Sequence, residues 1–186
     1  RSYLDHLGGG KEWGLDTIGS YAYLDFYQKL LQSQANGGEY FNDLITFLAT
    51  ANAPYTVFLE NKIVANVDLQ SVLHFHQENG NRITAVFKRV SKKNVAPDDQ
   101  LYILDEENTI MSCQQAIDTQ SQDSYNLGLN IYVADTKWLI AELKKAQKCG
   151  APIDIGQRFA SLAAKYRTNA YEYTGYLHNV HDIKSY

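Results

Sequence analysis

The chain has 186 residues and a formal charge of −4, and 45% of its residues are apolar or aromatic. This composition supports one compact core, excludes a disordered chain, and argues against general nucleic-acid binding, which needs a strongly basic face. No run approaches the roughly 20 apolar residues of a membrane span, and two cysteines, Cys113 and Cys149, are too few for a disulfide scaffold, which fits a reducing cytoplasm.

Hydrophobic periodicity and turn residues predict an alternation of helices and strands. The predicted helices cover 21–31, 39–51, 69–79, 135–149 and 153–166. The predicted strands cover 55–59, 63–67, 83–87, 101–105, 109–113, 127–133 and 170–173. Alternation in the first half favours parallel strands joined by right-handed crossovers, whereas 101–113 has the pattern of a hairpin. We therefore predict an α/β fold with a mixed, mainly parallel central sheet flanked by helices.

The glycines at 8–10, followed by Lys11, have a superficial likeness to a phosphate-binding loop. Such a loop needs a strand before its glycines and a Lys-Ser/Thr pair that enters a helix. Only seven residues precede Gly8, and Glu12 follows Lys11. We interpret this segment as a glycine turn.

His74 and His76 form a His-x-His pair within the predicted helix 69–79, for which Asp68 is a suitable N-cap. Residues two apart on a helix point in nearly opposite directions, so these two imidazoles cannot share a metal ion. We expect one partly buried and one exposed histidine.

Charged residues elsewhere define no active site by themselves. The basic group at 88–93 is most simply a solvated loop, and the alternative is a loop that binds a phosphorylated ligand. Functional carboxylates in α/β sheets lie just beyond strand ends, where the strand at 55–59 is followed by Glu60 and then Lys62. A lysine at that position opposes the binding of a divalent cation.

Collinear stretches of the chain carry a family resemblance: 6–16 (HLGGGKEWGLD), 55–69, 72–80, 130–133 (NIYV), 154–156 (DIG) and 175–186. In this order they resemble the bacterial glucose-1-phosphate adenylyltransferases, which are sugar-nucleotide pyrophosphorylases. The resemblance implies a Rossmann-like nucleotidyltransferase fold. It also implies that 1–186 is a partial domain, without the N-terminal strand and nucleotide loop and without the C-terminal β-helix of the family.

The family's site positions are altered in this chain. Its two magnesium-binding aspartates fall at Lys62, preceded by Asn61, and at Asn179. On the sugar-phosphate side, Asp154 is kept, the following lysine falls at Gln157, and a Glu-Lys-Pro motif falls near 114–117, where no lysine stands. A lysine and an asparagine cannot supply two anionic ligands for magnesium. If the resemblance is correct, Lys62 and Asn179 should face one cleft.

This pattern is most similar to the non-catalytic D-type subunits of the family. The resemblance then implies a regulatory or structural subunit of bacterial glycogen biosynthesis, cytoplasmic and without bound Mg or ATP. It would assemble with a catalytic adenylyltransferase subunit and respond to a sugar-phosphate or nucleotide effector. The first alternative is an active adenylyltransferase with a displaced metal site at Glu60 or Asp182. The second is an unrelated α/β ligand-binding module.

Overall fold

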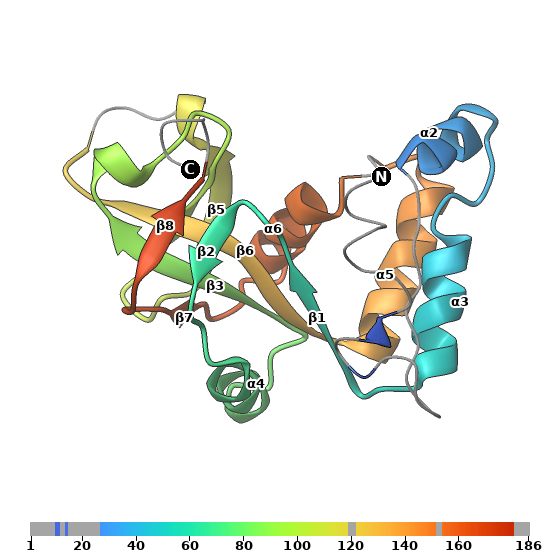
Figure 1. Cartoon of the computed structure of the whole chain (residues 1–186), viewed down its shortest axis with the longest axis horizontal. Coiled ribbons are helices and arrows are strands. Elements are labelled where there is room, and N and C mark those ends of the chain that lie inside the picture. The colour runs from blue at the N-terminus through green and yellow to red at the C-terminus, as the bar shows by residue number, and fades with distance from the viewer. Residues whose placement is uncertain (1–9, 12–13, 15–26, 119–121, 152–153, 181–186) are drawn as a thin grey trace.

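The computed structural model describes residues 10–11, 14, 27–118, 122–151 and 154–180 (Figure 1). Its helices are α2 (Tyr27–Ala35), α3 (Asn42–Ala51), α4 (Leu69–Glu78), α5 (Thr136–Lys148) and α6 (Ile155–Lys165), with short 3-10 turns at Lys92–Asn94 and Ala116–Asp118. Its strands are β1 (Tyr55–Leu59), β2 (Ile63–Ala65), β3 (Ile83–Val90), β4 (Gln100–Leu104), β5 (Ile110–Gln115), β6 (Tyr125–Asp135), β7 (Tyr171–Glu172) and β8 (Leu177–Asn179). None of these helices is long and apolar enough to cross a membrane.

Six strands form one mixed sheet in the order β5-β4-β6-β3-β7, and β1 pairs with the C-terminal part of β6, residues 131–135. The predicted α/β class and mixed sheet are confirmed, but the expected predominance of parallel pairing is wrong. Only β3 and β7 pair in parallel among the described strands, and β1, β3 and β4 all run antiparallel to β6. The physical reason is that β6 is inserted between β1 and β3, the strands that the alternating pattern suggested as parallel neighbours.

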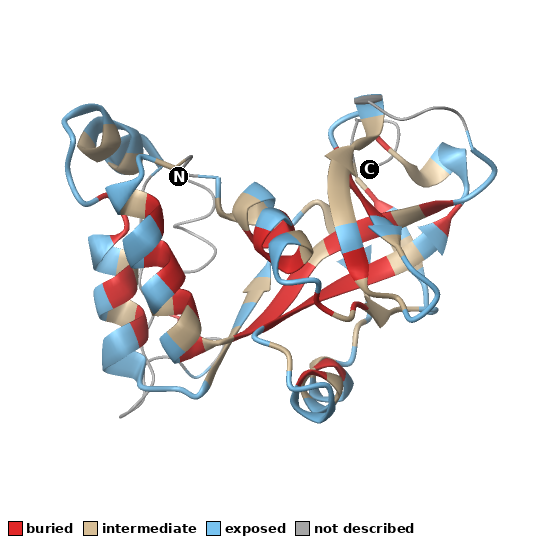
Figure 2. Cartoon of the chain, turned by 180° about the vertical axis from the view of Figure 1, so that it is seen from behind, coloured by how far each residue is buried: buried red, intermediate tan, exposed pale blue. Residues whose placement is uncertain are grey.

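The two faces of the sheet bury separate apolar clusters, and buried positions follow the long strands β3 and β6 (Figure 2). One cluster contains Phe87, Tyr132 and Phe159, and it lies under α3, α5 and α6. The other contains Val72, Val86 and Leu129, and α4 and residues of β2 and β8 pack against it. Successive residues of a strand point to opposite faces, which explains why neighbours such as Val86 and Phe87 enter different clusters.

The chain ends of the fold differ from the prediction. The final strand predicted at 170–173 is confined to β7, and a further strand, β8, was not predicted. The predicted helix 21–31 lies partly outside the described residues, and its described part begins α2. Strand β8 pairs with β2 in a two-stranded antiparallel ribbon, and this ribbon positions the candidate site.

The histidine pair divides into one exposed and one buried residue, and the buried residue, His76, lies deeper than the partial burial that was predicted. His76 is 1% exposed, and its ring contacts the Thr84 hydroxyl at 2.9 Å through Nδ1 and the Asp135 carboxylate at 3.4 Å through Nε2. His74 lies on the exposed side of α4, where its Nε2 is 3.0 Å from the Glu78 carboxylate. Burial lowers the pKa of His76, and this effect outweighs the opposite influence of Asp135.

We expect the free energy of unfolding to fall as the pH drops below about 6.5, the pKa of an unfolded-state histidine. Because the folded-state pKa of His76 is lowered, the unfolded chain binds more protons in this range, and stability is lost by up to about 1.4 kcal/mol per pH unit. Urea titrations between pH 8 and pH 5 measure this slope. The variant His76→Gln should flatten it and His74→Gln should preserve it, so equal slopes for the two variants would contradict this assignment.

Candidate functional site

The β2–β8 ribbon brings Lys62 and Asn179 side by side. These are the two positions at which the family resemblance places the magnesium-binding aspartates. Ile63 is paired with Asn179, and the Val180 N–H donates to the Lys62 carbonyl oxygen at 2.9 Å. Ile63 and Leu177 pack against the apolar cluster that contains Val72, which seats the ribbon on that face of the sheet. Two residues more than one hundred positions apart in the sequence therefore become neighbours.

A carboxylate from a third segment joins Lys62 to Asn179. The side chain of Asp99 is 3% exposed, and its Oδ1 accepts from Lys62 Nζ at 2.6 Å. Its Oδ2 accepts from Asn179 Nδ2 at 2.6 Å and from the Ala96 N–H at 2.6 Å. Asp98, whose side chain is 74% exposed, also accepts from Lys62 Nζ at 2.8 Å. We call Lys62, Asp98, Asp99 and Asn179 the Asp99 cluster.

The Asp99 cluster contains a cation, the Lys62 ammonium group. Partial burial acts to lower the pKa of Lys62, but hydrogen bonds to Asp98 and Asp99 and their negative charges outweigh it, so the pKa is raised. The ammonium group therefore stays charged at neutral pH. A buried carboxylate is stable only when it is paired and hydrogen-bonded, and Asp99 has both kinds of partner.

These residues do not fit a magnesium ion. Magnesium requires oxygen ligands at about 2.0–2.1 Å in near-octahedral geometry. Here Lys62 Nζ lies within hydrogen-bond distance of both carboxylates, and Asn179 directs its amide nitrogen toward Asp99. Across the described ranges, no group of three or more His, Cys, Asp or Glu residues is arranged to hold a metal ion.

The other predicted site residues are divided between two places. Asn61 is exposed at the bend before β2, next to Lys62. Asp154 and Gln157 lie at the start of α6, where Asp154 is the N-cap and its Oδ1 accepts from the Gln157 N–H at 2.9 Å. Both line a separate pocket that also contains Arg158. Because Ile155 packs against the cluster of Phe87, Asp154 and Gln157 belong to the opposite face of the sheet from Lys62.

Of the two alternative metal ligands, Glu60 and Asp182, the structure describes Glu60. Glu60 is exposed and accepts a hydrogen bond from the Asn130 side-chain amide, whereas Asp182 lies outside the described residues. The 114–117 segment forms the end of β5 and the start of the 3-10 turn after it. The sequence interpretation missed Asp99, because an acidic pair after a proline in a polar loop has no distinctive pattern.

The comparisons with known proteins agree with the resemblance found in the sequence. No protein-family model matches the chain. The chain is 32% identical over 90 residues to the glycogen biosynthesis protein GlgD of Bacillus subtilis (strain 168), which covers 47% of this chain and 26% of that protein. It is 30% identical over 92 residues to GlgD of Geobacillus stearothermophilus, covering 48% and 27%. The chain thus spans about a quarter of the length of these curated relatives, and over roughly half of its own length it is GlgD-like.

Proposed function

We propose that this chain belongs to a cytoplasmic subunit of bacterial glycogen biosynthesis that does not catalyse by itself and that assembles with a catalytic glucose-1-phosphate adenylyltransferase. The two GlgD relatives, both named as glycogen biosynthesis proteins, support the pathway. The observation that carries the non-catalytic role is the ion pair between Lys62 Nζ and Asp99, 2.6 Å apart, at a position where the family resemblance requires a metal-binding aspartate.

The chemistry of the family explains why this ion pair matters. Transfer of an adenylyl group concentrates negative charge on the attacked phosphate and on the departing pyrophosphate, and a metal ion stabilises that charge. In the Asp99 cluster the Lys62 ammonium group lies against both carboxylates and offsets one of their two negative charges, and it occupies the position next to them that a magnesium ion would need. An ammonium group can contact a phosphate as a point charge, but it cannot coordinate a metal.

We expect no formation of ADP-glucose from ATP, glucose 1-phosphate and magnesium by the protein that carries this chain, when it is assayed alone at its native length. Mixed with a catalytic adenylyltransferase subunit of the same organism, it should co-elute with that subunit and change its rate or its effector response. Pyrophosphate release, followed continuously, measures both conditions. The catalytic subunit with an equal amount of an unrelated protein is the control.

Robust activity of the protein alone would overturn the non-catalytic proposal and favour a displaced metal site at Glu60 or Asp182. Failure to co-elute with the catalytic subunit, with its kinetics unchanged, would overturn the proposed partnership. The two outcomes are independent, because a chain can lack activity without having this partner.

A further inference from the structure

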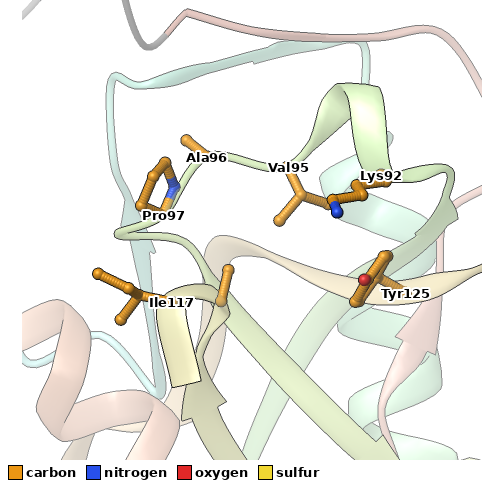
Figure 3. Close-up of a pocket in the computed structure, with 7 residues that line it drawn as sticks. Lys92, Val95, Ala96, Pro97, Ile117 and Tyr125 are labelled. Carbon is orange, nitrogen blue, oxygen red and sulfur yellow. The ribbon is translucent and has the colours of Figure 1, made fainter. Parts of the chain in front are cut away.

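A pocket lies on the loop that leads into β4, and Ala96 and Pro97 of its lining directly precede Asp98 and Asp99 in the chain (Figure 3). Its volume is about 250 Å³, and its walls come from the 92–97 segment, the 3-10 turn after β5 and the start of β6. An apolar cavity of roughly 150 Å³ is sufficient for a benzene ring. The pocket is therefore large enough for a six-membered ring that carries one further group.

The two ends of the pocket differ in chemistry. Pro97 and Ile117 lie at one end, with Ala96 and Val95 along the wall between the ends, and Lys92 and Tyr125 lie at the other (Figure 3). The Tyr125 hydroxyl accepts from the Gln122 N–H at 2.8 Å. The Lys92 ammonium group is positively charged, so this end suits an anion, whereas the apolar side chains at the other end suit a ring.

The walls are held in place by backbone hydrogen bonds. The Ile117 N–H donates to the Pro97 carbonyl at 3.0 Å, and the Ala116 N–H donates to the Asp99 carbonyl at 2.9 Å. The Ala96 N–H donates to the buried Asp99 carboxylate at 2.6 Å. Both sides of the pocket are thus attached to the Asp99 cluster, which reduces the entropy that a ligand would have to remove on binding.

We propose that this pocket binds a small organic anion in which a phosphate or carboxylate is attached directly to a compact ring. The ring lies between Pro97, Ile117 and the face of Tyr125, and the anionic group contacts Lys92. This inference stands apart from the proposed function, because it uses no residue of the metal positions. It also assigns a role to one lysine of the basic 88–93 segment and leaves Lys93 outside the pocket lining.

Phenyl phosphate is the probe that tests the proposal, with benzoate as the carboxylate form. Inorganic phosphate and benzyl alcohol supply the charge alone and the ring alone. In titrations followed by amide chemical shifts of the chain, phenyl phosphate or benzoate should bind with a Kd near 1 mM and shift residues around Tyr125. Phosphate alone and benzyl alcohol should each bind at least about tenfold more weakly, because each lacks one of the two contacts.

Matched variants separate the pocket from general charge effects. Lys92→Gln should weaken phenyl phosphate binding about tenfold, because a charge-assisted hydrogen bond is lost. Lys93→Gln removes the same charge one residue away and should leave the affinity unchanged. Ala116→Leu fills the pocket and should abolish saturable binding, and an unchanged melting temperature would show that this variant is folded. Equal affinity for phenyl phosphate and inorganic phosphate, or equal effects of the two lysine variants, would overturn the proposal.

Discussion

The variant Asp99→Asn should lower the free energy of unfolding by about 2–3 kcal/mol. The substitution keeps the shape of the side chain but removes the negative charge that faces Lys62 Nζ at 2.6 Å. It also leaves one acceptor oxygen where Asp99 has two, so either Lys62 Nζ or the Asn179 amide nitrogen loses its acceptor. The Lys62 side chain is 18% exposed, so water relieves part of the loss and keeps the effect below that of a fully buried pair.

Asp98→Asn is the matched control, because Asp98 also contacts Lys62 Nζ but has a side chain that is 74% exposed. An exposed ion pair contributes at most about 1 kcal/mol, so this variant should stay close to the wild-type protein. Urea denaturation followed by far-UV circular dichroism gives both values. A loss for Asp99→Asn no larger than that for Asp98→Asn would show that the Asp99 cluster does not hold the ribbon to the loop.

The variant Phe159→Ala should lower the free energy of unfolding by about 3–5 kcal/mol, the largest effect that we expect from a single substitution. Phe159 is 3% exposed, and its ring lies 5.0 Å from that of Phe58 and 5.3 Å from that of Tyr132, between centroids. Truncation removes both edge-to-face contacts and opens a cavity between α6 and the sheet. Such a loss is a large part of the 5–15 kcal/mol typical of a domain.

Ser161→Ala tests the specificity of this effect, because Ser161 is on the exposed side of the same helix and its hydroxyl donates to the Gln157 carbonyl at 2.9 Å. Surface substitutions of this kind change stability by about 0.5 kcal/mol or less. Thermal and urea unfolding of both variants compares them directly. Similar midpoints would mean that α6 does not pack through Phe159.

Much of the secondary structure could be predicted, because burial imposes a period on the sequence. Helix α6 buries one side, and strand β3 buries nearly all of its residues. The spacing of apolar residues in the sequence shows both patterns. Strand β8 has only three residues, of which Leu177 alone is a strong apolar residue, so it carries no detectable period. The pairing of the strands was harder to predict than their positions, because the place of β6 between β1 and β3 depends on contacts between distant segments.

The candidate site shows the same limit more sharply. The positions of Lys62 and Asn179 followed from the family resemblance, but their common partner did not. Asp99 is 37 residues from Lys62 and 80 residues from Asn179 along the chain, and no local pattern joins them. No local pattern in the sequence shows either that Lys62 and Gln157 lie against opposite faces of the sheet.

The sequence by itself determined the α/β class, the approximate positions of the helices and strands, and the absence of carboxylates at Lys62 and Asn179. These properties depend on local periodicity and on residue identity, which a sequence states directly. Only the tertiary structure decided the direction of the strand pairs and the ion pair between Lys62 and the buried Asp99. Both depend on which distant segments meet when the apolar faces are buried, and a buried carboxylate is stable only where such a meeting supplies its partners.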